Sequence, residues 1–178
     1  MKISSFCTSR QTLNPFSQTL ASLEQNLGPD HPRTLRVRHE LAHRFRAQGD
    51  FGQALRLFQA NAAGWSHTLG PDSAEALRAR SSLANCYYAA GRYDEAIQQF
   101  AQVLEHRERA LGPDHPETLR SRGSLANSYR AAGRPQEALG RHRALLPDRE
   151  RVLGPDHPST QATRKNLAAT QRELSVDE

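Results

Sequence analysis

Apolar residues recur every three or four positions along this chain, and the runs are too long for β-strands. In residues 69–111, one run ends at Ala90-Gly91, a typical helix stop, and a second run begins at Tyr93. The apolar positions of the two runs are Leu77, Leu83, Ala84 and Tyr87, then Tyr93, Ala96, Ile97, Phe100, Val103, Leu104 and Leu111. No stretch of the chain alternates apolar and polar residues as a half-buried strand does. The pattern therefore predicts two helices in this unit and no sheet.

This pair of helices recurs along the chain with a fixed period. The tetrapeptide Leu-Gly-Pro-Asp begins at Leu27, Leu69, Leu111 and Leu153, so each copy starts 42 residues after the previous one. One helix pair cannot bury its apolar face alone, and copies at a fixed period bury it by stacking against their neighbours. We therefore expect an all-α solenoid that forms one elongated domain.

The tetrapeptide is predicted to separate one helix from the next. Its glycine suits the left-handed position that follows the last turn of a helix, and its proline cannot continue that helix. These glycines are Gly28, Gly70, Gly112 and Gly154. The aspartate is expected to begin the next helix, because Asp72 and Glu75, like Asp114 and Glu117, have the spacing of a capping box.

A set of small, aliphatic and aromatic residues recurs at matching positions in three units. These residues are Leu41, Ala42, Phe45, Gly49, Phe51, Ala54 and Phe58; then Leu83, Ala84, Tyr87, Gly91, Tyr93, Ala96 and Phe100; then Leu125, Ala126, Tyr129, Gly133, Pro135 and Ala138. Their spacing resembles the tetratricopeptide repeat. The 42-residue period and the Leu-Gly-Pro-Asp-His-Pro link are similar to the kinesin light chain class of these repeats, which is also common in bacterial arrays. The resemblance covers residues 15–174 and implies a right-handed superhelix of helix-turn-helix units.

The period divides the chain into whole and partial units. Residues 14–26 align with the second helix of a unit whose first helix is missing, and residues 1–13 are expected to be a disordered leader. Gln171 stands where Tyr87 and Tyr129 stand in complete units, so the last helix is expected to be a polar cap. Within a single solenoid over 14–178, the predicted units are a half repeat 14–26, repeats 27–68, 69–110 and 111–152, and a C-terminal half repeat or cap 153–174.

Composition excludes several classes of protein. Mean hydropathy is −0.75, and no apolar run approaches the roughly 18 to 20 residues that cross a bilayer. The N-terminal residues lack the apolar stretch of a signal peptide. Cys7 and Cys86 show no C-x-x-C spacing, so they are expected to be reduced thiols. These features together predict a cytoplasmic protein without a membrane segment.

The chain carries none of the motifs of a catalytic site. It has no nucleophile elbow, phosphate loop or constellation of paired carboxylates. His31, His115 and His157 each follow an aspartate, but these pairs lie in separate turns, so no place gathers enough ligands for a metal ion. We therefore predict a protein that is not an enzyme and that holds neither a cofactor nor a metal.

The resemblance implies that the first helix of each pair lines the concave face, where extended peptides bind in this family. Steps of three, four and three residues along these helices reach polar or small residues on that face. They are Arg36, His39, His43 and Arg46; Arg78, Ser81, Asn85 and Tyr88; Arg120, Gly123, Asn127 and Arg130; and Ala162, Lys165, Ala169 and Arg172. From this set, the predicted peptide-binding residues are Arg36, His43, Arg46, Arg78, Asn85, Tyr88, Arg120, Asn127 and Arg130.

Two kinds of side chain on this face indicate the chemistry of the ligand. Asn85 and Asn127 are equivalent residues whose amides can bond to a peptide backbone, with a bond to a neighbouring helix as the alternative. Arg36, Arg78 and Arg120 form a ladder whose planar guanidinium groups favour carboxylates, with a merely solvated face as the alternative. A second arginine ladder lies closer to the packed side, and its stems are expected to cover apolar surface while its heads reach water. It consists of Arg38, Arg80, Arg122 and Arg164.

The predicted function is a scaffold that binds an extended, acidic peptide of a protein partner in the concave groove. An alternative is an assembly or regulatory module of a larger signalling complex, which self-associates or docks through its ends. Nucleic-acid binding is a more distant alternative. The chain has 24 basic and 19 acidic residues and a net charge of +5, but acidic residues are interspersed and stacking aromatics are almost absent from the groove.

Overall fold

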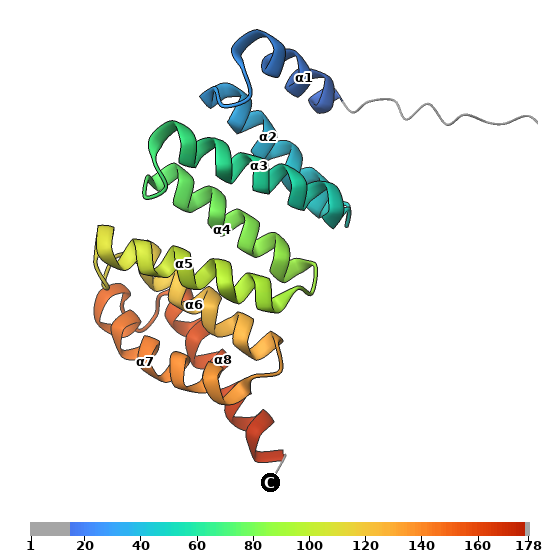
Figure 1. Ribbon diagram of the computed structural model, residues 1–178. Coiled ribbons are helices and arrows are strands. Elements are labelled where there is room, and N and C mark those ends of the chain that lie inside the picture. Colours follow the sequence, from blue (N-terminus) through green and yellow to red (C-terminus); the bar gives the residue numbers. More distant parts are fainter. Residues whose placement is uncertain (1–14, 177–178) are drawn as a thin grey trace, which may run out of the picture.

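The computed structural model describes residues 15–176, and within this range it contains eight helices and no strand (Figure 1). The helices are α1 (Pro15–Leu27), α2 (Pro32–Ala47), α3 (Phe51–Leu69), α4 (Ala74–Ala89), α5 (Tyr93–Leu111), α6 (Pro116–Ala131), α7 (Pro135–Leu153) and α8 (Pro158–Val176). None of these eight helices is long and apolar enough to cross a membrane. The predicted leader 1–13, with Cys7, lies outside the described residues.

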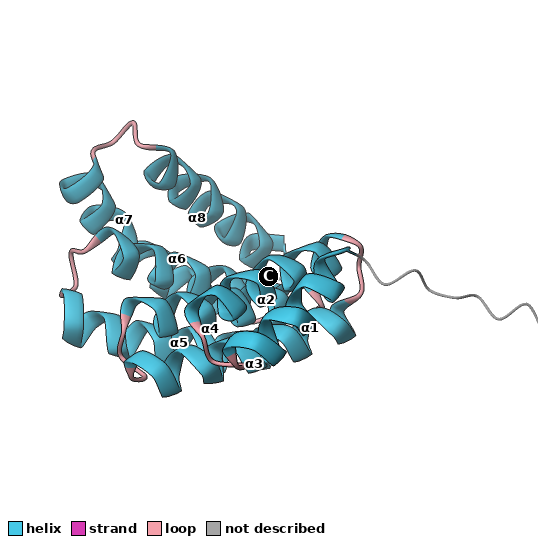
Figure 2. Ribbon diagram, turned by 90° about the horizontal axis from the view of Figure 1, so that it is seen from above, coloured by secondary structure: helices cyan, strands magenta, loops and turns pink. Residues whose placement is uncertain are grey.

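The helices stack in the order of the chain, and each one packs against the next. Beyond these sequential contacts, α2 touches α4 and α6 touches α8, so alternate helices lie side by side. Seen along the stack, α2, α4, α6 and α8 lie on the inner side of the curve, and α3, α5 and α7 lie on its outer side (Figure 2). The prediction of an all-α solenoid built from helix pairs is confirmed.

Alanines at the helix crossings let neighbouring helices approach closely. Ala42, Ala84 and Ala126 on the inner helices are fully buried, and the matching alanines of the outer helices are buried as well. Phe58 and Phe100 fill the space between units and are almost completely buried, which stabilises the fold by about 1.5–3 kcal/mol for each ring. The positions that carry the family resemblance are therefore the positions that bury apolar surface between units.

The inner helices α2, α4 and α6 each end at a glycine with a positive φ angle. At Gly133, φ is 72°, its N–H donates to the Arg130 carbonyl (3.1 Å), and the Arg134 N–H donates to the Tyr129 carbonyl (3.0 Å). This pair of bonds is the Schellman motif. The outer helices end differently. Gly112 of the tetrapeptide has φ 85° and ψ 165°, so its φ is positive as predicted, but its backbone is extended rather than left-handed helical.

The prediction that the aspartates of the tetrapeptide cap the next helices is wrong. The N-cap of α6 is His115, whose Nδ1 accepts from the Glu117 N–H (3.2 Å). The N-cap of α4 is Ser73, whose Oγ accepts from the Ala76 N–H (3.3 Å). In α6 the reason is the proline at the first helical position. Because Pro116 has no N–H to leave unpaired, the helix begins there and the preceding residue takes the cap position.

The aspartates of the tetrapeptide instead form pairs within their own unit. Asp30 pairs with His67 (2.9 Å), and Asp114 accepts from Arg151 (2.8 Å). Each pair joins the turn at the start of a unit to the end of the outer helix of the same unit. The hydrogen bond from Arg151 holds the pKa of Asp114 below its usual value. Because these pairs are exposed, we expect them to orient the turns more than to stabilise the fold.

The heads of the second arginine ladder form ion pairs, where the sequence analysis expected them to reach water. Arg38 is buried and donates to Glu24 (2.8 Å). Arg122 and Arg164 pair in the same way with the glutamates 14 residues before them. Arg80 differs, because a serine stands at the position of the glutamate, and it has no ion pair among the described residues. These pairs tie α2, α6 and α8 each to the helix that precedes it.

Two glycines in neighbouring elements test the role of the positive φ angle. Replacing Gly133 by alanine is expected to lower the free energy of unfolding by about 1–2 kcal/mol, because an L side chain is strained at that angle. Replacing Gly140 within α7, where an added Cβ meets no atom within 4 Å, is expected to raise it by about 0.5–1 kcal/mol, because alanine is the better helix former. Urea unfolding followed by circular dichroism measures both changes. Effects of the same sign would contradict this assignment.

Candidate functional site

Three cavities follow one another along the inner side of the stack. The first, of about 330 Å³, is lined by α2, α3 and α4; the second, of about 340 Å³, mainly by α4, α5 and α6; and the third, of about 120 Å³, by α6, α7 and α8. His39 and Arg78 line both the first and the second cavity, and Arg120 lines both the second and the third. Because they share these residues, the three cavities form one continuous site, which we call the inner groove.

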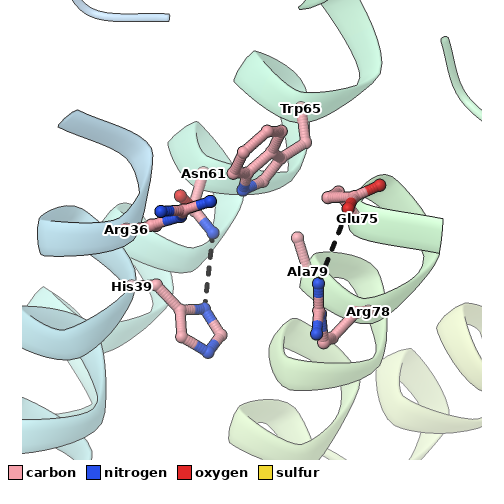
Figure 3. Close-up of a pocket in the computed structure, with 7 residues that line it drawn as sticks. All are labelled: Arg36, His39, Asn61, Trp65, Glu75, Arg78 and Ala79. Atoms are coloured by element: carbon pink, nitrogen blue, oxygen red, sulfur yellow. Dashed lines mark hydrogen bonds and ion pairs between the residues drawn. The ribbon is translucent and has the colours of Figure 1, made fainter. Parts of the chain in front are cut away.

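The first cavity has an aromatic wall. Figure 3 shows Trp65 of α3 between Arg36 on one side and Glu75 and Arg78 on the other. Trp65 is 8 % exposed and belongs to a small core cluster with Ala79, which also lines the cavity. Because Trp65 and Ala79 lie beside arginines in its lining, this cavity combines apolar and cationic groups.

Asn61 and two histidines form the polar part of this end of the groove. Asn61 is buried; its Nδ2 lies 3.4 Å from His39 Nδ1, and its Oδ1 has no partner. His39 Nε2 lies 3.0 Å from His43 Nε2. Burial, followed by the effects of His43 and Arg78, lowers the pKa of His39 to about 4. Burial and Arg46 lower the pKa of His43 as well. The pair is therefore uncharged at neutral pH, and one ring donates to the other.

The groove carries more cationic than anionic side chains. Its lining includes one carboxylate, that of Glu75, which lies 3.8 Å from Arg78. Its arginines are Arg36, Arg78, Arg107, Arg120 and Arg149. Arg36 and Arg149 have no carboxylate partner among the described residues. The groove thus carries a net positive charge, and Glu117, which pairs with Arg107 and Arg120, lies beside its second cavity.

Five of the nine residues predicted from the sequence line the inner groove. They are Arg36, Arg78, Asn85, Arg120 and Asn127. The other four lie on the inner helices outside the three cavities: His43, Arg46, Tyr88 and Arg130. Tyr88 packs edge-to-face on Tyr93, with 5.5 Å between ring centroids, and Arg130 lies 3.8 Å from Glu173. The structure thus divides the predicted set into residues that face the groove and residues that flank it.

The two equivalent asparagines have different surroundings. Asn127 Oδ1 accepts from Asn166 Nδ2 of α8 (2.8 Å), which is the bond to a neighbouring helix that the sequence analysis left open. Asn85 is exposed, and its Nδ2 donates to the Ser81 carbonyl of its own helix (2.8 Å). Since this bond uses a single donor of the amide, Asn85 retains an acceptor for a peptide N–H.

The outer helices contribute groove residues that the sequence analysis did not predict. Trp65, Arg107 and Arg149 reach the three cavities from α3, α5 and α7. They stand at the same position of three successive units, where a helix otherwise continues its apolar stripe. Trp65 continues that stripe, whereas Arg107 and Arg149 break it, and the break is the signal that could have revealed them. It was missed because the resemblance assigns the concave face to the first helix of each pair.

Metal ligands do not gather anywhere in the described part of the chain: it holds no group of three or more His, Cys, Asp or Glu side chains that could bind an ion. Cys86, the free cysteine of this part, is buried, and burial raises the pKa of its thiol. A buried thiol with a raised pKa is a poor nucleophile, so we assign Cys86 to the core.

Comparisons with known proteins agree with this architecture. The family model described as "Tetratricopeptide repeat" matches residues 45–109 and, in a second overlapping match, residues 75–150. The two matches together cover more than half of the chain. No curated protein matches the chain.

Solved structures with the same arrangement of helices include two crystal structures from Podosopora anserina, described as nearly identical TPR-like repeats of a putative kinesin light chain. The first has 29 % sequence identity and a TM-score of 0.78, and it covers 90 % of this chain and 76 % of that one. The second, a point variant of that protein, has the same identity and coverage and a TM-score of 0.79. BtubC (BKLC) from P. vanneervenii has 18 % identity and a TM-score of 0.69, with 90 % and 67 % covered, and shows the fold alone.

The buried histidines predict how stability depends on pH. Burial lowers the pKa of His39 and of His142 to about 4, so below about pH 6.5 the unfolded chain binds protons that the folded chain does not. The free energy of unfolding is therefore expected to fall between pH 7 and pH 5, by up to about 1.4 kcal/mol per pH unit for each histidine. Urea unfolding at several pH values measures this slope. A double variant, His39→Gln with His142→Phe, is expected to have a shallower slope, and an unchanged slope would contradict the assignment.

Proposed function

The chain belongs to the tetratricopeptide repeat family, and from this premise we propose that its inner groove binds an extended, acidic segment of a protein partner. Proteins of this family are non-enzymatic scaffolds for protein–protein interaction, and the chain is such a scaffold. The observation that carries the finer proposal is the charge of the inner groove, whose lining includes five arginines and one carboxylate.

The arginines of the groove are poorly compensated within the protein. Arg36 is exposed and has no partner among the described residues. Arg107 and Arg120 both pair with the same carboxylate, that of Glu117. A guanidinium group can donate two parallel hydrogen bonds to a carboxylate. Opposite charges 4 Å apart attract by about 1 kcal/mol in water and about 4 kcal/mol near a protein surface. An acidic segment therefore gains more from this groove than a neutral one.

The continuity of the groove supports an extended ligand. Because neighbouring cavities share His39, Arg78 and Arg120, a segment can run from one unit to the next without leaving the surface. An extended peptide leaves its backbone N–H and C=O groups unpaired, and these groups need partners when a protein covers them. The free acceptor of Asn85 and the hydroxyl groups of Ser81 and Ser124 lie along this path.

Two other functions receive less support from the described residues. Nucleic-acid binding needs open aromatic faces on which bases stack, but the groove aromatics Trp65 and Phe100 are buried. Self-association or docking through the ends would be favoured by an uncovered apolar face on a terminal helix. In α1, however, Leu20 is buried and Phe16 and Leu23 are half-buried.

Charge reversal in the groove tests the proposal. The double change of Arg36→Glu with Arg78→Glu is expected to weaken binding of an acidic peptide by about tenfold or more, because each change removes an attraction and adds a repulsion. The probe is a fluorescent panel of extended peptides rich in Asp and Glu, compared with the same peptides carrying Asn and Gln. Anisotropy titrations measure the affinity, which is also expected to fall as salt is added.

The matched control reverses two charges outside the groove. Arg56 of α3 and Arg143 of α7 are exposed, line none of the three cavities, and have no partner among the described residues. If Arg56→Glu with Arg143→Glu weakens binding as much as the groove variant does, the groove is not the binding site. Tighter binding of single-stranded RNA than of any peptide would instead favour nucleic acid, and a mass that rises with concentration would favour self-association.

A further inference from the structure

The third cavity of the inner groove contains polar groups that the protein itself leaves unpaired. It is lined by residues of α6, α7 and α8, has a volume of about 120 Å³, and shares Arg120 with the second cavity. In the described part of the chain, six buried side-chain nitrogen or oxygen atoms lack a hydrogen-bond partner. Three of these six belong to His142 and Arg149, which both line this cavity. The unpaired donors and acceptors of the fold are thus concentrated here.

Arg149 is a buried cation without a counter-ion. It is 7 % exposed, and its guanidinium donates to the carbonyls of Ser159 (2.8 Å) and Leu119 (2.9 Å) and to Thr163 Oγ1 (2.6 Å). All three acceptors are neutral, and Nε has no partner. Burial lowers the pKa of Arg149. A buried charge that lacks a counter-ion costs several kcal/mol, which a carboxylate can offset.

The preceding unit shows how this charge is balanced elsewhere. Arg107 stands one period before Arg149, is equally buried, and pairs with Glu117 Oε2 (2.9 Å). One period after Glu117 the chain has Ser159, whose side chain carries no charge. The unit 111–152 therefore keeps the buried arginine, but the segment that follows it lacks the carboxylate that would neutralise this charge.

His142 adds a second unpaired group to the same cavity. It is 1 % exposed, and neither Nδ1 nor Nε2 has a partner. The equivalent residues of the two preceding units are Phe58 and Phe100, which need no hydrogen bond. Burial, together with Arg130 and Arg149, lowers the pKa of His142 to about 4. The neutral ring still carries one N–H, and leaving it unpaired costs about 1–3 kcal/mol.

The remaining lining suits a small anion. The nine residues that line the cavity include no carboxylate. Asn127 accepts from Asn166, so its own amide N–H₂ remains a donor. Gly123 allows the guanidinium to pack directly against its backbone, because a Cβ at this position would lie 2.6 Å from Arg149 Nη2. The cavity volume of about 120 Å³ is large enough for a carboxylate group.

We propose that this cavity binds a carboxylate, and that its occupant is an aspartate or glutamate side chain of the acidic segment in the inner groove. The inference rests on the proposed function and assigns one position of that segment. The carboxylate lies beside the Arg149 guanidinium and the His142 ring, and its charge balances the guanidinium as Glu117 balances Arg107. The acidic residue of the partner at this position therefore lies beside a buried arginine. Acidic residues at other positions of the segment meet exposed arginines of the groove, such as Arg36.

The first test supplies the missing charge from within the chain. Ser159→Glu places a carboxylate at the position equivalent to Glu117, where we expect it to pair with Arg149. Relative to the neutral control Ser159→Gln, it is expected to raise the thermal unfolding midpoint by about 4 °C and to weaken binding of the acidic peptide about tenfold. A second control, Gln136→Glu, adds the same charge at an exposed position of α7 outside the cavity and is expected to change the affinity little.

The second test observes the cavity directly by NMR of the whole chain. The His142 ring and Arg149 Nε–H resonances are expected to shift when the glutamate peptide binds, and not with its glutamine analogue. Acetate, with chloride as the control at constant ionic strength, reports on a free carboxylate.

The outcomes of the two tests separate the two proposals. If the acidic peptide binds while both resonances stay unchanged and Ser159→Glu matches Ser159→Gln, the cavity proposal is overturned and the groove proposal stands. If acetate shifts the resonances but no peptide binds, the cavity binds a free carboxylate and not a side chain of a partner. This result would overturn both the proposed occupant and the proposed function. Shifts caused by the peptide and abolished by Ser159→Glu support the proposal.

Discussion

Close approach of neighbouring helices at their alanine positions is the constraint on which this structure depends. Ala42, Ala84 and Ala126 are completely buried, and a larger side chain there would push adjacent helices apart. Phe58 and Phe100 would then lose their cover, because each ring fills the space between two units. Each unit is therefore stable only through its neighbours, as in other stacked arrays.

The same stacking brings charged residues of different units together, and it balances them unevenly. Where an arginine meets a carboxylate of the next unit, as Arg107 meets Glu117, the charge is balanced within the protein. Where the carboxylate is missing, as beside Arg149, the fold keeps a buried charge and an adjoining cavity. Repeats that share a backbone can therefore differ in what they bind. In this chain the differences lie on the inner side, while the turns and the core repeat almost unchanged.

Much of the fold and part of the candidate site could be predicted from the sequence. The helices and their period follow from spacing, and the family resemblance together with that spacing places Arg36, Arg78, Asn85, Arg120 and Asn127 on the inner side. The helix caps could not be predicted correctly from the capping-box spacing, because the proline that follows each histidine shifts the start of the helix by one residue. Trp65 and Arg149 were missed because they reach the groove from helices that the spacing assigns to the outer layer.

The sequence by itself determined the helix pair, the 42-residue period and membership of the repeat family, because these depend on residues close together within one unit. Only the tertiary structure decided which side chains meet across units and which remain unpaired. The ion pair of Arg107 with Glu117 joins one unit to the next, as does the bond from Asn166 to Asn127, which spans 39 residues. Such contacts depend on the angle and distance at which units stack. The spacing of residues within a unit does not contain that information.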